Sequence, residues 1–225
     1  MRDLLIAGAT GIDGRSADLG IAGGRFADVS DLHDPERIAA DGLIVLPGLV
    51  DSHTHLREPG REDAETIGTG TRAAARGGFT AVHAMANLDP VTDTAEAAEY
   101  LAALAARTAN AEVIVVGAVT KGLSGQELAE LGLMHRSTAG VRMFSDDGRC
   151  VADPLMMRRA RTYAKAFGGV IAQHAQDPRL AGPGACGHES EISGRLGLPG
   201  WPAQAESTII ARDVELAQLS GGRLH

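Results

Sequence analysis

From residue 47 onward, short apolar stretches alternate with longer Ala-rich stretches. We predict strands at about residues 48–54, 79–85, 112–118, 139–145 and 168–174, with a sixth beginning near 222. We predict helices within residues 62–78, 94–109 and 153–169, where helix-forming residues follow an acid or precede a Gly stop. This repetition is typical of an α/β fold with a parallel sheet. Strand-helix units that recur in this number favour a barrel, although periodicity alone leaves a doubly wound sheet open.

Residues 1–46 have a different pattern. The short apolar runs LLIAGA, LGIAGG, RFADV and GLIVL are separated by Gly, Asp and Ser, which predicts short strands joined by turns. We therefore expect two parts: an N-terminal β segment at 1–46 and a barrel of about five to six strands at 47–225.

Composition limits the partners. A hydrophobic content of 44% supports a globular core, and a net charge of −8 argues against nucleic acid or an anionic membrane as a partner. The N-terminus lacks an apolar run long enough for a signal peptide, and no uninterrupted apolar stretch approaches the ~20 residues of a spanning helix. The two cysteines lack CxxC spacing, so the sequence indicates neither a disulfide framework nor a thiolate zinc site. We expect a cytoplasmic protein with a small-molecule partner.

The stretch PGLVDSHTHLREPG, residues 47–60, places chemistry at the end of the first barrel strand. In an extended strand, His53 and His55 project from the same face, and imidazole nitrogens suit a divalent metal. Later strand ends add His174 and the pair Asp146-Asp147 to the same rim. From these residues alone, a hydrogen-bonded histidine and a turn before Gly remain alternatives.

Several ordered motifs together resemble one family. The segments PGLVDSHTHLREPGRED, MANLDPVTD, GAVTKGLSG, FSDDG, LGLPGWPAQAE and RDVELA are similar to dihydroorotase of the amidohydrolase superfamily, in the class that bridges its metals with aspartate. The resemblance implies a (β/α)8 TIM-type barrel beside a small β-sandwich built from both chain ends. It also implies two zinc ions and reversible hydrolysis of dihydroorotate to carbamoyl aspartate in pyrimidine biosynthesis.

The resemblance also implies site residues. One zinc would be held by His53 and His55, both zincs by Asp147, and the second by His174, while the substrate carboxylate would be held by Arg57 and Asn87. A planar guanidinium fork matches a carboxylate, which agrees with the role of Arg57.

Three other polar residues remain open. Asp51 shares the strand face of His53, and His83 either lines the pocket or is a satisfied core histidine. Lys121 competes for the bridging position, since a carboxylated lysine bridges metals in related hydrolases, but it follows the third strand and Asp147 is preferred. Around Asn87 the chain reads MANL where the family form is closer to MPNT, which weakens the substrate match.

The chain ends at His225, within a stretch that resembles HxxHVS of the sixth strand. We therefore expect an N-terminal part of a longer enzyme. The resemblance places a further histidine ligand, the aspartate that acts as general acid and base, and the rest of the sandwich beyond residue 225. No catalytic residue is assigned within 1–225, and we expect this segment alone to be poorly soluble and inactive.

Two competing functions remain. An allantoinase or dihydropyrimidinase shares DxHxH and the barrel, but an uncharged ring offers Arg57 no carboxylate. The other is a catalytically inactive structural subunit, for example one associated with aspartate carbamoyltransferase. Such a subunit would not need metal ligands, so the four matched ligands argue against it. A homo-oligomer is compatible with either function.

Overall fold

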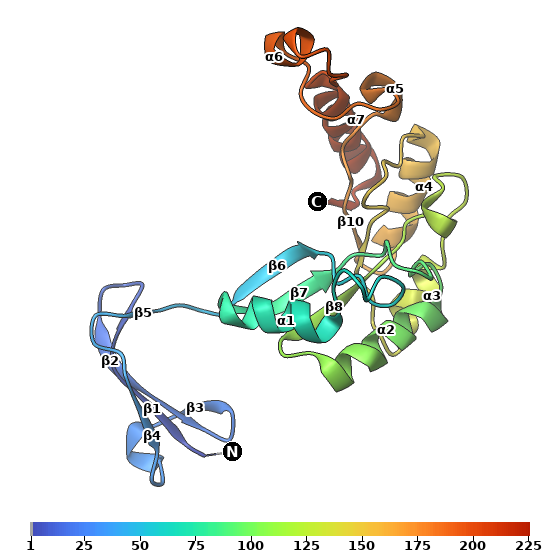
Figure 1. Cartoon of the computed structure of the whole chain (residues 1–225). Coiled ribbons are helices and arrows are strands. Elements are labelled where there is room, and N and C mark those ends of the chain that lie inside the picture. The colour runs from blue at the N-terminus through green and yellow to red at the C-terminus, as the bar shows by residue number, and fades with distance from the viewer. Residues whose placement is uncertain (1) are drawn as a thin grey trace. The chain divides into compact units, whose positions relative to one another are not determined.

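The computed structural model describes residues 2–225, which form two compact units separated between Gly48 and Leu49 (Figure 1). This division lies close to the predicted boundary at residues 46 and 47. That the first unit is one half of a composite sandwich stays a prediction.

The first unit is a mixed five-stranded sheet. Its order is β3-β2-β1-β4, and β5 also pairs with β1. The pairing of β1 is antiparallel to β2 and parallel to β4 and β5. The bounds are β1 Leu4–Gly11, β2 Ser16–Ala22, β3 Arg25–Ala27, β4 Glu36–Ala39 and β5 Ile44–Val45. The sequence patterns missed β4, because its sequence ERIA has two charges and all four residues are exposed.

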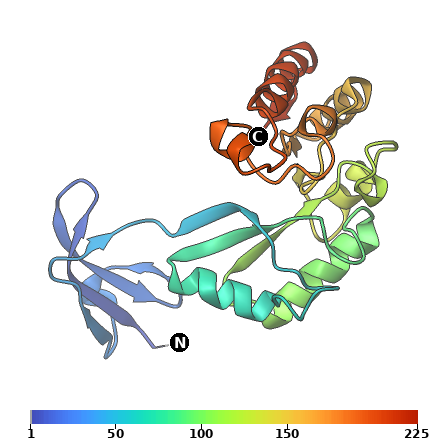
Figure 2. The same ribbon diagram turned by 45° about the horizontal axis from the view of Figure 1, so that its top comes forward.

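The second unit contains a six-stranded parallel sheet in the order β11-β10-β9-β8-β7-β6 (Figures 1 and 2). Each strand adds to the same edge as its predecessor, so the order never reverses as it does in a doubly wound sheet. The sheet is a curled half-barrel, which confirms the predicted α/β barrel-type fold. The bounds are β6 Leu49–Thr54, β7 Phe79–Ala84, β8 Glu112–Gly117, β9 Met143–Phe144, β10 Val170–Ile171 and β11 Arg223–Leu224.

All six strands lie where the sequence predicts them, but β9 and β10 are much shorter than expected. Pairing continues beyond them as single backbone hydrogen bonds, such as Ser145 N to Gly117 O at 2.8 Å and Ala172 N to Phe144 O at 2.9 Å. The chain therefore leaves regular strand geometry just where the polar residues begin.

The three predicted helices are present, with ends set by capping residues. Helix α1 (Ile67–Arg76) begins later than the acidic stretch suggests because Thr66 caps it in a reciprocal box with Thr69. Helix α2 (Ala95–Thr108) is capped by Thr94, and α4 (Pro154–Lys165) by Asp153 with Pro in the first turn.

Four further α-helices were not predicted: α3 Leu131–Arg136, α5 Pro178–Ala181, α6 Glu191–Arg195 and α7 Gln204–Ser220. The longest, α7, starts at Ala203 without a side-chain cap, so its sequence lacks the usual start signal. It packs against α4 and also contacts α5.

One core joins the sheet to its helices. Fully buried side chains include Ile67 of α1, Val82 of β7, Leu101 of α2, Phe144 of β9 and Met157 of α4. This packing leaves the carboxyl ends of the strands free for polar residues. Within residues 2–225, no helix has the length and apolar character needed to cross a membrane.

Candidate metal centre

Four predicted ligands lie at the carboxyl end of the parallel sheet. His53 belongs to β6 and His55 follows it directly, so strand geometry directs both rings the same way. Asp147 follows β9, and His174 follows β10. Their shared position results from the parallel direction of the strands.

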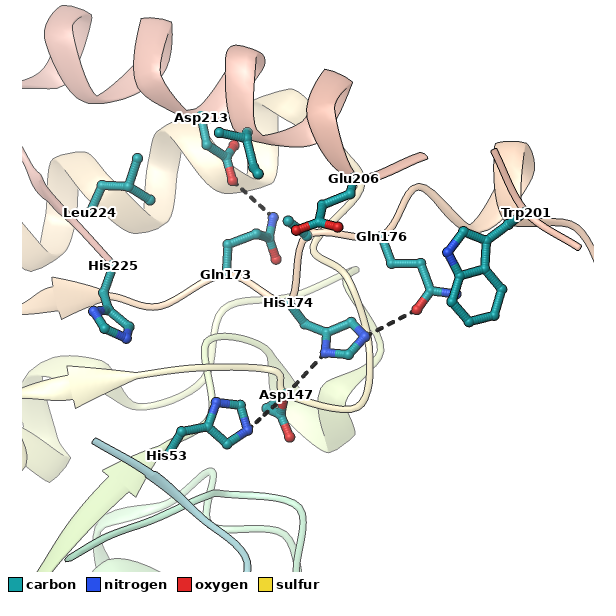
Figure 3. Close-up of a pocket in the computed structure, with 12 residues that line it drawn as sticks. His53, Asp147, Gln173, His174, Gln176, Trp201, Glu206, Asp213, Leu224 and His225 are labelled. Carbon is teal, nitrogen blue, oxygen red and sulfur yellow. Dashed lines mark hydrogen bonds and ion pairs between the residues drawn. The ribbon is translucent and has the colours of Figure 1, made fainter. Parts of the chain in front are cut away.

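The four side chains meet at the Asp147 carboxylate. His53 Nε2 lies 3.2 Å from Oδ1, and His174 Nδ1 lies 3.1 Å from Oδ1 (Figure 3). His55 Nε2 lies 3.2 Å from Oδ2. The rings of His53 and His55 have centroids 5.3 Å apart and an interplanar angle of 69°. Three imidazole nitrogens, two from the end of β6 and one from the end of β10, therefore surround one carboxylate.

This donor set fits a divalent transition metal. Ligand atoms of His53, His55 and Asp147 all lie within 4.8 Å of one another, and His174 extends the group through Asp147. Imidazole nitrogen and carboxylate oxygen are ligands that zinc and similar ions accept. Oδ1 of Asp147 faces His53 and His174, and Oδ2 faces His55, so the carboxylate contacts candidate ligands through both of its oxygens.

Electrostatics keep this carboxylate ionised. Only 6% of the Asp147 side chain is exposed, and burial by itself would raise its pKa. The hydrogen bond from His174 and the charges of His53, His55 and His174 outweigh burial and lower the pKa of Asp147 to about 2. In the metal-free protein, the hydrogen bond with Asp147 raises the pKa of His174, against the opposing effect of burial.

The neighbouring Asp146 has a structural role. Its side chain is buried and accepts hydrogen bonds from Val119 N at 2.8 Å, from Thr120 N at 2.9 Å and from the Thr120 hydroxyl. These bonds tie the loop after β9 to the loop after β8. Of the two adjacent aspartates, only Asp147 faces the histidines.

The two predicted substrate residues lie in the loops that follow β6 and β7. Arg57 follows β6 with a positive φ of 61°, in the left-handed region. Asn87 follows β7, and its Oδ1 lies 3.0 Å from His55 Nδ1. Asn87 thus contacts a candidate ligand, while its role toward substrate stays a prediction.

The residues left open by the sequence have local partners. The Asp51 carboxylate accepts from the His53 backbone N–H at 3.0 Å, and His83 Nδ1 donates to the Asp51 carbonyl at 3.2 Å. Lys121 Nζ pairs with Glu127 at 2.6 Å on the surface. None of the three belongs to the histidine-carboxylate cluster formed within residues 2–225.

A cavity of about 580 Å³ opens beside the cluster. His53, Asp147 and His174 form one side, and the wall is completed by residues that the sequence did not single out, including Gln176, Trp201 and Glu206 (Figure 3). Gln176 Oε1 lies 3.2 Å from His174 Nε2. The polar run HAQD at a strand end was the signal for Gln176, and Trp201 and Glu206 lie within the motif LGLPGWPAQAE that supported the family resemblance.

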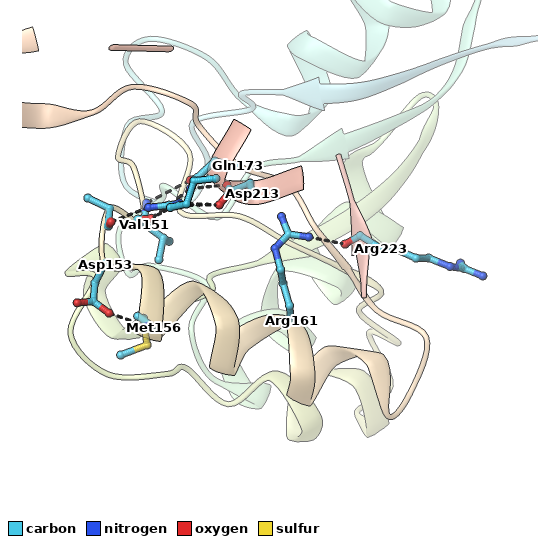
Figure 4. A network of polar contacts seen from close by, with 9 residues as sticks. Val151, Asp153, Met156, Arg161, Gln173, Asp213 and Arg223 are labelled. Atoms are coloured by element: carbon cyan, nitrogen blue, oxygen red, sulfur yellow. Dashed lines mark hydrogen bonds and ion pairs between the residues drawn. The ribbon is translucent and has the colours of Figure 1, made fainter. Parts of the chain in front are cut away.

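A partly buried polar network holds α7 against this wall. The Gln173 amide donates to Asp213 at 3.0 Å and to the Val151 carbonyl at 3.2 Å (Figure 4). The Arg212 guanidinium donates to Asp213 at 2.7 Å and to the Val151 and Ala152 carbonyls. The network fixes α7 relative to β10 and to the loop before α4.

Structural comparison shows the fold. The chain is similar to the L-hydantoinase (dihydropyrimidinase) of Arthrobacter aurescens, with a TM-score of 0.77 and 22% identity over all of this chain and 52% of that one. It is likewise similar to the dihydropyrimidinase of Brevibacillus agri, with a TM-score of 0.76 and 21% identity over 99% of this chain and 51% of that one.

Sequence comparison shows the family. A family model described as dihydro-orotase-like matches residues 42–225. Proteins named dihydroorotase are 57% identical over 98% of the chain in Leifsonia xyli and 54% identical over all of it in Streptomyces coelicolor. The chain covers 51% and 53% of those two proteins, so it spans about half the length of the curated relatives it matches. Because the family model and these relatives cover most or all of the sequence, the chain belongs to the dihydro-orotase-like family.

Proposed function

We propose that the protein that carries this chain is a zinc-dependent cyclic amidohydrolase that reversibly hydrolyses dihydroorotate to carbamoyl aspartate in pyrimidine biosynthesis. The observation that carries the proposal is the convergence of three histidine nitrogens on both oxygens of Asp147 in a member of this family. The names of the relatives supply the substrate.

In this proposal, two zinc ions are held by His53, His55, Asp147 and His174. Bound divalent cations activate water and polarise the amide carbonyl. Asp147 supplies the negative charge that two adjacent cations require, and its low pKa keeps it ionised across the neutral range. The imidazoles supply neutral nitrogen donors.

Substrate orientation falls to the loops beside the cluster. Dihydroorotate carries a carboxylate outside its ring, and the Arg57 guanidinium forms a bidentate, charge-assisted pair with it. The Asn87 amide adds a neutral donor. No residue of 1–225 is proposed as the general acid or base.

The proposal also covers the setting of the enzyme. It acts in the cytoplasm on a small molecule, residues 1–46 form part of a composite sandwich, and association is with further copies or with aspartate carbamoyltransferase. Size-exclusion chromatography with light scattering, with and without the transcarbamoylase, tests the association; a monomer in both runs would contradict it.

The activity is tested on the complete gene product that contains the chain. Zinc-loaded enzyme is assayed with dihydroorotate, hydantoin, dihydrouracil and allantoin, and we expect dihydroorotate to be preferred. Arg57→Ala should lower kcat/KM for dihydroorotate by about 10- to 150-fold, the loss of a charge-assisted hydrogen bond of about 1.5–3 kcal/mol, and should leave zinc content unchanged. Arg61→Ala is the matched control, because Arg61 is exposed and pairs with Asp63.

Three outcomes would contradict the proposal. Preference for an uncharged ring would favour an allantoinase or dihydropyrimidinase. A zinc-loaded protein without activity on any substrate would favour a structural subunit. Equal loss of zinc and activity in Arg57→Ala would make Arg57 a structural residue.

A further inference from the structure

Two side-chain amides contact the candidate ligands His55 and His174 on opposite ring nitrogens. Asn87 Oδ1 lies 3.0 Å from Nδ1 of His55, and Gln176 Oε1 lies 3.2 Å from Nε2 of His174 (Figure 3 shows the second contact). In each ring the other nitrogen faces the bridging carboxylate: His55 Nε2 at 3.2 Å and His174 Nδ1 at 3.1 Å.

An amide oxygen accepts hydrogen bonds and never donates them. The Asp147 carboxylate that faces the other nitrogen also only accepts, so without a metal either ring nitrogen can donate. A metal at the Asp147 side would displace the proton there, and the proton that remains would lie on the nitrogen that faces the amide, which leaves the opposite nitrogen its free lone pair. A metal binds through that free lone pair. The contact with the amide thus decides which nitrogen of each histidine is available as a ligand.

We propose that Asn87 and Gln176 are positioning residues that hold His55 and His174 in opposite tautomers, so that Nε2 of His55 and Nδ1 of His174 are the metal-binding atoms. This inference rests on the metal centre of the proposed function and not on its substrate. It assigns Asn87 a role toward the metal site that is separate from its proposed role toward the substrate carboxylate.

The contact also fixes the orientation of the Asn87 amide. With Oδ1 held by His55, the NH2 group is the free end, and an NH2 group donates to an anion. One residue can then orient a ligand through its oxygen and meet the substrate through its nitrogen. Replacement by aspartate separates these roles, because aspartate keeps an acceptor for His55 and loses the donor.

Paired variants of the complete gene product test the assignment. Asn87→Leu and Gln176→Met remove the acceptor, and Asn87→Asp and Gln176→Glu keep it. Zinc affinity is measured by competition with a chelator, with Zn²⁺ as the only added ligand. We expect about 10- to 100-fold weaker binding in the variants without an acceptor and near wild-type binding in those that keep it. Gln126→Met, at an exposed loop position, is the matched control.

Tautomers are read by two-bond 1H–15N correlation of 15N-histidine-labelled, zinc-loaded protein, with single histidine substitutions for assignment. We expect a protonated Nδ1 in His55 and a protonated Nε2 in His174. Asn87→Leu should alter the His55 pattern and spare His174, and Gln176→Met should do the reverse. If circular dichroism shows that Asn87→Leu does not fold, Asn87→Ala replaces it.

Several results would overturn the assignment. Unchanged zinc affinity and tautomers in the variants without an acceptor would do so, as would equal losses in Asn87→Asp and Asn87→Leu, which would leave only a packing role. A wild-type protein that does not bind zinc would overturn both proposals. A wild-type protein with these tautomers but no hydrolysis of dihydroorotate would sink the proposed function alone.

Discussion

The adjacent residues Asp146 and Asp147 should respond differently to the same substitution. Asp146 is buried and accepts two backbone N–H groups and one hydroxyl from the loop after β8. Asp147 faces three histidines. Replacing each by alanine therefore removes a loop connection in one case and a metal ligand in the other.

The cost of Asp146→Ala follows from the donors it leaves unpaired. A buried donor without a partner costs about 1–3 kcal/mol, and three are left here. The sum is an upper bound, because water can enter the vacated space and because burial of the carboxylate already opposes folding, as the raised pKa of Asp146 indicates. We expect the free energy of unfolding to fall by about 3–5 kcal/mol. Asp146→Asn keeps one acceptor oxygen and should cost about 1–2 kcal/mol.

Urea denaturation of the metal-free protein, followed by circular dichroism, measures these changes, and chelator competition measures zinc affinity. Asp147→Ala should abolish tight zinc binding with a clearly smaller loss of stability. A cost below about 1 kcal/mol for Asp146→Ala would refute the structural role. Loss of zinc in Asp146→Ala with unchanged stability would exchange the roles of the two residues.

Three further predictions concern pH, a glycine and the α7 network. Because contact with Asp147 raises the pKa of His174, zinc affinity should fall as pH drops through that pKa, which zinc titrations at several pH values measure. In the metal-free protein, the stabilisation of the fold by the His174–Asp147 contact should be full below the ordinary pKa of 6.5 and lost as pH rises through the raised pKa, which urea midpoints at the same pH values measure. Gly60→Ala should lower the urea midpoint, because at its φ of +105° a Cβ would lie 2.5 Å from the Asp89 Cβ; an unchanged midpoint would contradict the close approach. Asp213→Ala leaves the largely buried Arg212 guanidinium without its counter-charge and removes one of the two acceptors of the Gln173 amide, and should cost about 3–5 kcal/mol in urea denaturation, whereas a cost near zero would make the network dispensable.

Local sequence determined the strands of the barrel unit and the direction of its first two ligands. Apolar runs bounded by polar or Gly residues give β6 to β10 their places, because burial of a strand depends on its own residues. His53 and His55 point the same way because alternate residues of a strand share a face. Ordered sequence motifs along the whole chain identified the dihydroorotase family, which the sequence comparisons confirm.

Other features depended on contacts between distant segments. The patterns missed α7, which has no capping side chain and is held by Asp213 and Gln173 rather than by a start signal of its own. They also predicted longer strands for β9 and β10, where regular pairing stops after two residues. In each case a partner from another part of the chain decides the local conformation.

The site shows the same division. Read from its residues alone, FSDDG did not distinguish Asp146 from Asp147, since both stand in one turn; the family resemblance assigned the metal to Asp147 without giving a physical reason. Tertiary structure separates them, because the loop after β8 supplies the donors that take up Asp146 and leave Asp147 to the histidines. Likewise, the contact of Asn87 with His55 joins two neighbouring strand ends. Periodicity encodes the direction of each side chain within its own strand or helix. The groups that the side chain contacts depend on which strands are neighbours in the folded sheet.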